Sequence, residues 1–223
     1  MISPRSRALP RSVTPALALA LVTFLGAPAH AQTAAPTPPS ANEIALAREQ
    51  SRIGVEAARQ QRWTEAREAF ERSYRLYPRT LTLLNLAGAQ VESGQLVEGT
   101  ESYRRFLQEA TSGPAAAQRD AAQHALMDAE ARIPRLRVAA AGLLASDQLL
   151  LDGQAVSHAA LGAQLPVDPG PHVLAVLRNG TDIVHTSFSV EPRGTRDVSL
   201  TVPAPPPVAA NTTGGRTGTP TTT

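Results

Sequence analysis

The sequence predicts an α+β protein of two domains, in which paired α-helices are followed by a small antiparallel β-sandwich. Three observations predict this fold class. A pattern of small and aromatic residues recurs at an offset of 33 residues between positions 47 and 110, which is typical of helical-hairpin repeats. After Pro134 apolar residues alternate with polar ones, as in half-buried strands. Between two such runs lies Asn179-Gly180, a strong short signal for a β-hairpin.

Residues 1–31 have the features of a secretory signal peptide. Arginines precede an apolar core over 16–27, and Ala29 and Ala31 supply the small residues of a cleavage site. An uncleaved membrane anchor is the alternative, but this core is shorter than the roughly 20 residues that a bilayer requires. We therefore expect a mature chain from Gln32 with no stable membrane span. Its basic residues are all arginine and it is rich in alanine, which is typical of GC-rich bacteria, so we expect the periplasm or cell envelope.

A helical domain is expected over residues 42–133, after a disordered linker at 32–41. Ser40 and Glu43 have the spacing of a capping box, which places the start of the first helix near Ala41. Apolar residues at helical spacing, with breaks at Pro78 and Gly94, predict helices at 42–60, 64–76, 81–92 and 96–109. Thr64 is the expected cap of the second helix. An alanine-rich stripe predicts one further helix, 114–132, that covers the second hairpin.

Three residues of the first hairpin return 33 positions later as residues of similar kind: Gly54 as Ala87, Ala66 as Gly99 and Phe70 as Tyr103. Small residues at matching places allow two helices to approach closely, and the aromatic residue fills the gap between hairpins. The resemblance is to two tandem tetratricopeptide repeats and covers some 64 positions. It is carried by these residues and by Trp63, Glu65, Pro78, Asn85, Leu86 and Gly94. The chain departs from that pattern at Gly99, where alanine is typical, and at Thr111, where a closing proline belongs.

The tetratricopeptide resemblance implies a concave groove lined by the first helix of each hairpin. In this chain it places Arg52, Val55 and Arg59 beside Asn85 and Glu92. Two arginines one or two turns apart can hold a carboxylate through paired hydrogen bonds, and Asn85 could bond a peptide backbone. The alternative for these residues is a solvated charged surface.

The second domain is expected over residues 134–203, and a disordered tail rich in proline and threonine over 204–223. Strands are predicted from Arg135, at 172–178 and 181–190, and near Val198, with further turns at Asp152-Gly153 and Asp168-Pro169-Gly170. The segments Leu151-Asp152-Gly153 and 165–176, with the alternation around Phe188, resemble the PEGA domain, a small bacterial β-sandwich. Ala140-Ala141-Gly142 stands where the namesake motif of that family is expected.

The sequence offers no arrangement typical of catalysis or metal binding. It has no cysteine, and neither a glycine-rich phosphate loop nor a strained nucleophile turn is present. We expect His124, His158, His172 and His185 to have solvated or turn roles, because none has a second metal-ligand residue at suitable spacing. Asp152 and Asp168 are expected to bond their own backbone in turns; calcium binding or acid catalysis is a remote alternative.

These observations favour a non-catalytic protein without catalytic residues, metal or cofactor. The formal net charge is +2, and the arginines of 1–31 account for it, so a nucleic-acid partner is not expected. We expect an interaction or scaffold module of the bacterial envelope that binds a protein or peptide partner in the groove. The alternative is binding of cell-wall glycan or another surface polymer by the β-domain, with the repeats as a spacer. Sugar sites favour exposed aromatics, and Phe188 is the only aromatic residue after Phe106. The oligomeric state is left open.

Overall fold

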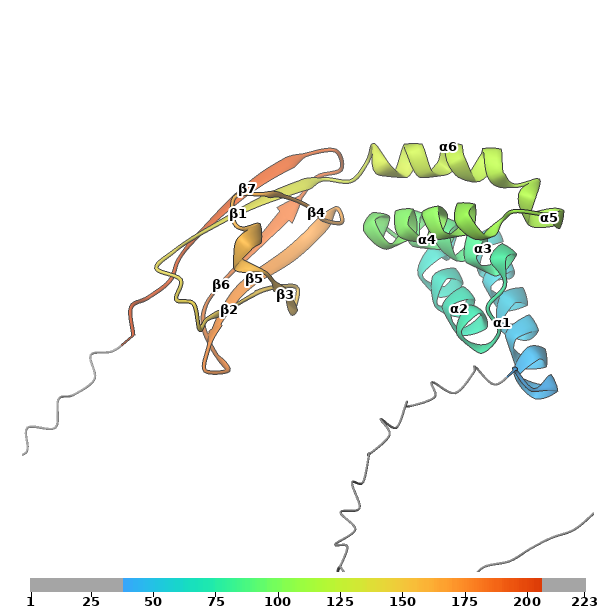
Figure 1. Ribbon diagram of the computed structural model, residues 1–223, viewed down its shortest axis with the longest axis horizontal. Coiled ribbons are helices and arrows are strands. Elements are labelled where there is room, and N and C mark those ends of the chain that lie inside the picture. The colour runs from blue at the N-terminus through green and yellow to red at the C-terminus, as the bar shows by residue number, and fades with distance from the viewer. Residues whose placement is uncertain (1–37, 206–223) are drawn as a thin grey trace, which may run out of the picture. The chain divides into compact units, whose positions relative to one another are not determined.

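The computed structural model describes residues 38–205 and confirms an α+β protein in which paired helices precede two β-sheets (Figure 1). The expected signal peptide at 1–31, residues 32–37 of the expected linker and the tail from 206 onward lie outside the described residues. Across 38–205, no helix combines the length and the apolarity that crossing a bilayer requires.

The first helical hairpin begins at the predicted capping box. In α1 (Ala41–Arg59) the amide of Glu43 donates to Ser40 Oγ at 3.2 Å, and the amide of Ser40 donates to Glu43 Oε2 at 2.7 Å. After α1 the chain reverses at Gln61, whose φ of 57° places it in the left-handed region. Helix α2 (Trp63–Leu76) follows at once. The predicted Thr64 cap is therefore wrong: Arg62 precedes the helix, without a side-chain cap, and Thr64 lies in its first turn.

The second hairpin repeats this turn 33 residues later. Gly94 has a φ of 93° and takes the place of Gln61 between α3 (Thr80–Glu92) and α4 (Leu96–Glu109). In both turns a backbone amide reaches back to close the preceding helix: Arg62 donates to the Ala57 carbonyl at 2.9 Å and Gln95 to the Gln90 carbonyl at 2.8 Å. The 33-residue period therefore applies to the backbone as well as to the side chains.

The single helix predicted at 114–132 is in fact two. A short helix, α5 (Gly113–Ala116), is separated by one turn from α6 (Arg119–Glu130), because the amide of Gln118 bonds the carbonyl of Ala115, three residues back. The guanidinium of Arg119 donates to the Leu107 and Ala110 carbonyls at the end of α4. Figure 1 shows α6 running alongside α4, which it covers as expected.

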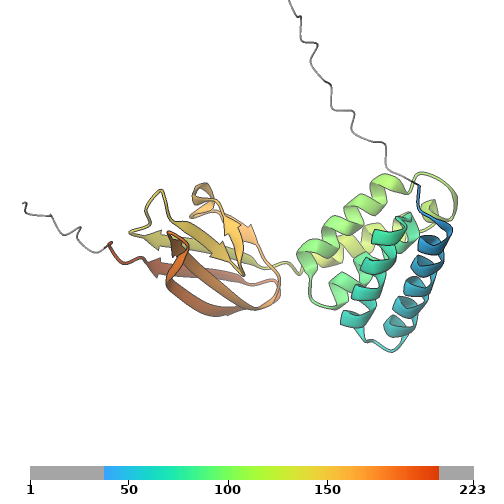
Figure 2. The ribbon, with the colours of Figure 1, turned by 90° about the horizontal axis from the view of Figure 1, so that it is seen from below.

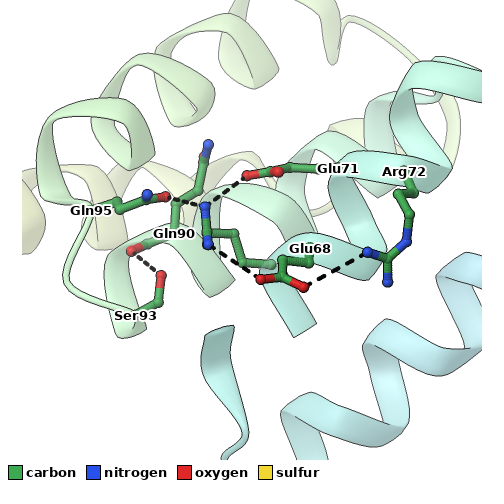
Figure 3. A network of polar contacts seen from close by, with 7 residues as sticks. Glu68, Glu71, Arg72, Gln90, Ser93 and Gln95 are labelled. Atoms are coloured by element: carbon green, nitrogen blue, oxygen red, sulfur yellow. Dashed lines mark hydrogen bonds and ion pairs between the residues drawn. The ribbon is translucent and has the colours of Figure 1, made fainter. Parts of the chain in front are cut away.

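Helices α1 to α4 pack in chain order, each against the next, and α6 packs against α4; Figure 2 shows these helices side by side. Their contacts are made by small residues and a few aromatics, with Ala57, Ala66, Ala87 and Phe106 fully buried. A polar network also joins the hairpins. Arg67 Nη1 donates to Gln95 Oε1 at 3.1 Å, ahead of α4, and approaches Glu71 Oε1 at 3.3 Å (Figure 3).

The β-domain consists of two sheets that share one apolar core. The strands are β1 (Arg135–Ala141), β2 (Gln148–Leu151), β3 (Gln154–Val156), β4 (Gln164–Pro166), β5 (Gly170–Arg178), β6 (Thr181–Val190) and β7 (Thr195–Thr201). One sheet has the order β4-β1-β7 and the other β3-β2-β5-β6. Pairing is antiparallel as predicted, except that β1 and β7 are parallel, from Arg135 opposite Thr195 to Ala141 opposite Thr201. Between them the chain crosses to the other sheet and returns.

Two hairpin turns have the backbone that their sequences predict. Asn179 and Gly180, between β5 and β6, have φ values of 52° and 78°, and Asp152 and Gly153, between β2 and β3, have 51° and 79°. Positive φ at both central residues is typical of the type I′ turn, which matches the twist of the flanking strands. Both turn predictions are confirmed.

Candidate functional site

A groove lies between α1 and α3, the first helices of the two hairpins. It contains two hollows with volumes of about 470 and about 240 Å³, and Asn85 lines both, so the hollows adjoin. Side chains reach the groove from α1 at positions 47, 48, 51, 55, 58 and 59, which is one face of a helix. The groove therefore results from stacking one hairpin on the next.

The larger hollow is predominantly apolar. Its walls are the first helices of the hairpins, and its floor carries Phe70 and Tyr103, which are 2% and 7% exposed. Burial and the nearby Glu92 carboxylate both raise the pKa of the Tyr103 hydroxyl, so the ring is a neutral surface. The remaining lining residues are Val55, Ala58, Arg59, Trp63, Leu84, Asn85, Gly88, Ala89 and Glu92.

Four of the five residues expected to bind a partner line this larger hollow: Val55, Arg59, Asn85 and Glu92. Arg52 does not. It lies beside Arg59 in a shallow depression on α1, and its guanidinium bonds Glu49 through two contacts of 3.0 and 2.7 Å. Arg59 likewise has a carboxylate on its own helix, since Nη1 lies 3.8 Å from Glu56 Oε2. Each arginine therefore already has a carboxylate partner on α1, and the two do not form a ready site for a carboxylate of another protein.

The smaller hollow is basic, and the sequence analysis missed the residues that make it so. Arg48 and Arg79 line it together with Ser51, Tyr77, Thr82 and Asn85, and none of its lining residues is acidic. Among the described residues, neither arginine takes part in an ion pair; Arg79 lies over the Tyr77 ring, 5.7 Å from its centroid. Arg48 precedes Val55 by two helical turns and so lies on the same face of α1, a spacing from which its place in the groove could have been predicted. Arg79 lies outside any helix, so periodicity could not place it.

The histidines have different surroundings. His124 and His185 are exposed, as expected, and His185 lies 3.0 Å from Asp182. His158, in a short 3₁₀ turn, has Nε2 2.9 Å from the Asp147 carbonyl. The prediction of a solvated or turn role is wrong for His172, which is 8% exposed in β5 because its ring turns toward the sandwich core.

The expectation that the two turn aspartates bond their own backbone is wrong for the side-chain bonds that the structure describes: Asp152 bonds strand β5, and Asp168 Oδ1 accepts from the Val97 amide at 2.9 Å. Asp152 was expected to bond only its own turn, but Oδ2 lies 2.6 Å from His172 Nδ1 and Oδ1 accepts from the Val173 amide at 2.8 Å. The carbonyl of Asp168 lies 2.7 Å from His172 Nε2. These contacts arise because the β2–β3 turn and the β4–β5 connection lie on either side of the start of β5.

Within residues 38–205, no three His, Asp or Glu side chains converge as a metal site would require. Comparison with known proteins adds no further assignment. No protein-family model matches this sequence, and no curated protein is significantly similar to it.

Proposed function

We propose that this protein is an exported, non-catalytic interaction module that holds a segment of a partner protein in the α1–α3 groove. The observation that carries the proposal is the pair of adjoining hollows, one apolar and one basic, which meet at Asn85. We propose further that the helices are tetratricopeptide repeats and that the β-domain is a PEGA-like sandwich. The expected signal at 1–31 supports action in the bacterial envelope.

The chemistry of the two hollows defines the partner segment. Apolar side chains of the partner would fill the larger hollow, against Val55, Leu84 and Phe70, and their burial would supply most of the affinity. An acidic group of the partner would enter the smaller hollow, where Arg48 and Arg79 have no carboxylate partner among the described residues. The Asn85 amide lies between these positions and offers a donor and an acceptor to the backbone of the segment.

Glycan binding by the β-domain has weaker support. Phe188 is the only aromatic residue of that domain, and its ring packs against the core and stacks on His172 with centroids 5.6 Å apart. A sugar would therefore not have an exposed aromatic ring on which to stack.

Selection from a library of displayed linear peptides tests the proposal. Peptides selected on the full-length protein are expected to combine apolar residues with at least one acidic residue, and Asn85→Arg should abolish their binding by filling the junction of the hollows. Gln108→Arg, an equal gain of charge on an exposed part of α4, should leave binding unchanged. The proposal fails if the selection yields no binders or if Asn85→Arg binds them as wild type does.

A further inference from the structure

His172 is a buried histidine with a hydrogen-bond acceptor at each ring nitrogen. Nδ1 lies 2.6 Å from Asp152 Oδ2, and Nε2 lies 2.7 Å from the carbonyl oxygen of Asp168. The ring is 8% exposed, and Phe188 from β6 stacks on it with an interplanar angle of 28°. Water therefore has little access to either nitrogen.

Only the doubly protonated ring satisfies both contacts. A backbone carbonyl can accept but never donate, and the same holds for an ionised carboxylate. The Asp152 carboxyl group, whose side chain is 45% exposed, also accepts the Val173 amide through Oδ1 at 2.8 Å. A neutral imidazole has one N–H, so one of its nitrogens would face an acceptor at short range with a lone pair instead of a proton.

The ring connects three segments of the β-domain. His172 belongs to β5, and Asp152 to the turn between β2 and β3, both in the four-stranded sheet. Asp168 belongs to the connection between β4 and β5, which crosses from the three-stranded sheet to the four-stranded one. The bond from Nε2 to Asp168 thus fixes a crossing between the sheets.

We propose that His172 is a pH-operated latch that holds the β4–β5 connection closed when its ring is protonated and releases it when the ring loses a proton. The neutral ring keeps its proton on Nδ1, because a hydrogen bond to the Asp152 carboxylate is stronger than one to a neutral carbonyl. The bond to Asp168 is then the one lost. Val167 stays anchored by its buried side chain and by its amide bond to the Pro134 carbonyl, so the backbone of 168 and 169 is the segment that moves.

The direction of the pH response follows from the groups that face the ring. Burial lowers the pKa of His172, but the bond with Asp152, the bond with the Asp168 carbonyl and the charges of both aspartates outweigh it. The pKa consequently lies above its ordinary value; Phe188, facing from β6, adds no charge. A raised pKa means that the stabilisation is complete below the pKa of the unfolded chain and is lost as pH rises through the folded value.

Nitrogen-15 NMR of the histidine rings in the full-length protein tests the latch without any substitution. Below the ordinary histidine pKa of about 6.5, both ring nitrogens of His172 should be protonated, and its titration midpoint should lie above that ordinary value. Above the midpoint only Nδ1 should keep its proton, and amide exchange at 168 and 170 should quicken by roughly tenfold relative to the amides at 180 and 181, after correction for intrinsic exchange.

Two variants separate the latch from a merely structural histidine. Asp152→Asn keeps an oxygen acceptor but removes the charge, so it should move the His172 midpoint downward, whereas His185→Gln should leave that midpoint in place. The proposal is overturned if wild-type His172 carries a single ring proton at low pH. It is equally overturned if exchange at 168 and 170 shows no change across the midpoint.

Discussion

Gly99 occupies the position that Ala66 has in the first hairpin, and the structure explains the difference. A Cβ added at Gly99 would lie 2.6 Å from Val91 Cγ2 and 3.2 Å from the Ala87 carbonyl oxygen, so α3 and α4 approach too closely for any side chain. The first hairpin has its glycine on the other helix, where a Cβ at Gly54 would meet the Phe70 ring at 2.7 Å. Each hairpin thus carries one glycine and one alanine at the repeated positions.

Gly99→Ala is expected to destabilise the protein by about 1–3 kcal/mol, because the backbone of α3 cannot retreat from the added methyl group. Gly88→Ala is the matched control in a neighbouring helix. Its Cβ would lie 3.5 Å from the Tyr103 hydroxyl, an ordinary contact, so higher helix propensity should make it neutral or stabilising by up to about 1 kcal/mol. Denaturant unfolding measures both, and equal stability of the two variants would contradict the close approach at Gly99.

Asp147 and Arg178 form a buried pair in the β-domain. The guanidinium donates to both carboxylate oxygens at 2.8 and 2.7 Å and to the Pro203 carbonyl at 2.8 Å. The two side chains are 0% and 12% exposed. Bonds from Arg178 lower the pKa of Asp147 to about 2 against the opposite effect of burial, and the Leu144 amide adds to the lowering.

A lowered pKa gives this pair a defined pH dependence. Its contribution is present above the ordinary value of 3.8 and is lost as pH falls toward about 2. The difference in unfolding free energy between wild type and Asp147→Asn should therefore be constant near neutral pH and shrink over that range. Asp197→Asn, which removes an exposed carboxylate 3.8 Å from Arg137, should show little difference at any pH. A difference for Asp147→Asn that does not change with pH would rule out the ionic origin.

At the scale of elements, α6 closes the apolar side of the second hairpin. Ala122, Leu126 and Ala129 are buried and join the cluster that contains Tyr103 and Phe106 of α4. A stack of only two hairpins would leave the apolar outer side of the second hairpin exposed to solvent, and α6 covers it.

Leu126→Ala should cost about 2–5 kcal/mol, because it leaves a cavity between α6 and α4. Its neighbour Met127 is 59% exposed, so Met127→Ala should change stability by less than about 0.5 kcal/mol. Thermal unfolding distinguishes them. If both substitutions were equally mild, α6 would not be part of the helical core.

The sequence determined most elements because their signals are local. The capping box at Ser40 and the two Xaa-Gly hairpin turns depend on residues within one or two turns of each other, and the period of 33 repeats the local pattern of a single hairpin. Three short strands, β2 to β4, were not predicted, since three or four residues are too few to show alternation. The parallel pairing of β1 with β7 and the place of Arg79 in the groove depend on long-range packing, which no local pattern encodes.

For the molecule as a whole, the groove is a product of assembly and no single helix forms it. Arg48 comes from α1, Arg79 from the link between the hairpins and Asn85 from α3, and stacking alone brings them to one hollow. The proposed function therefore depends on the hairpins being packed as the structure describes.

The affinity of one selected acidic peptide for the wild-type protein and for Arg48→Ala/Arg79→Ala tests this account most directly. We expect a loss of at least about tenfold, or about 1.4 kcal/mol, because the peptide carboxylate loses both guanidinium partners. Arg72→Ala/Arg75→Ala removes the same charge from α2 outside both hollows and should bind as wild type does. Equal losses in the two double variants, or no loss in the first, would contradict binding in the groove.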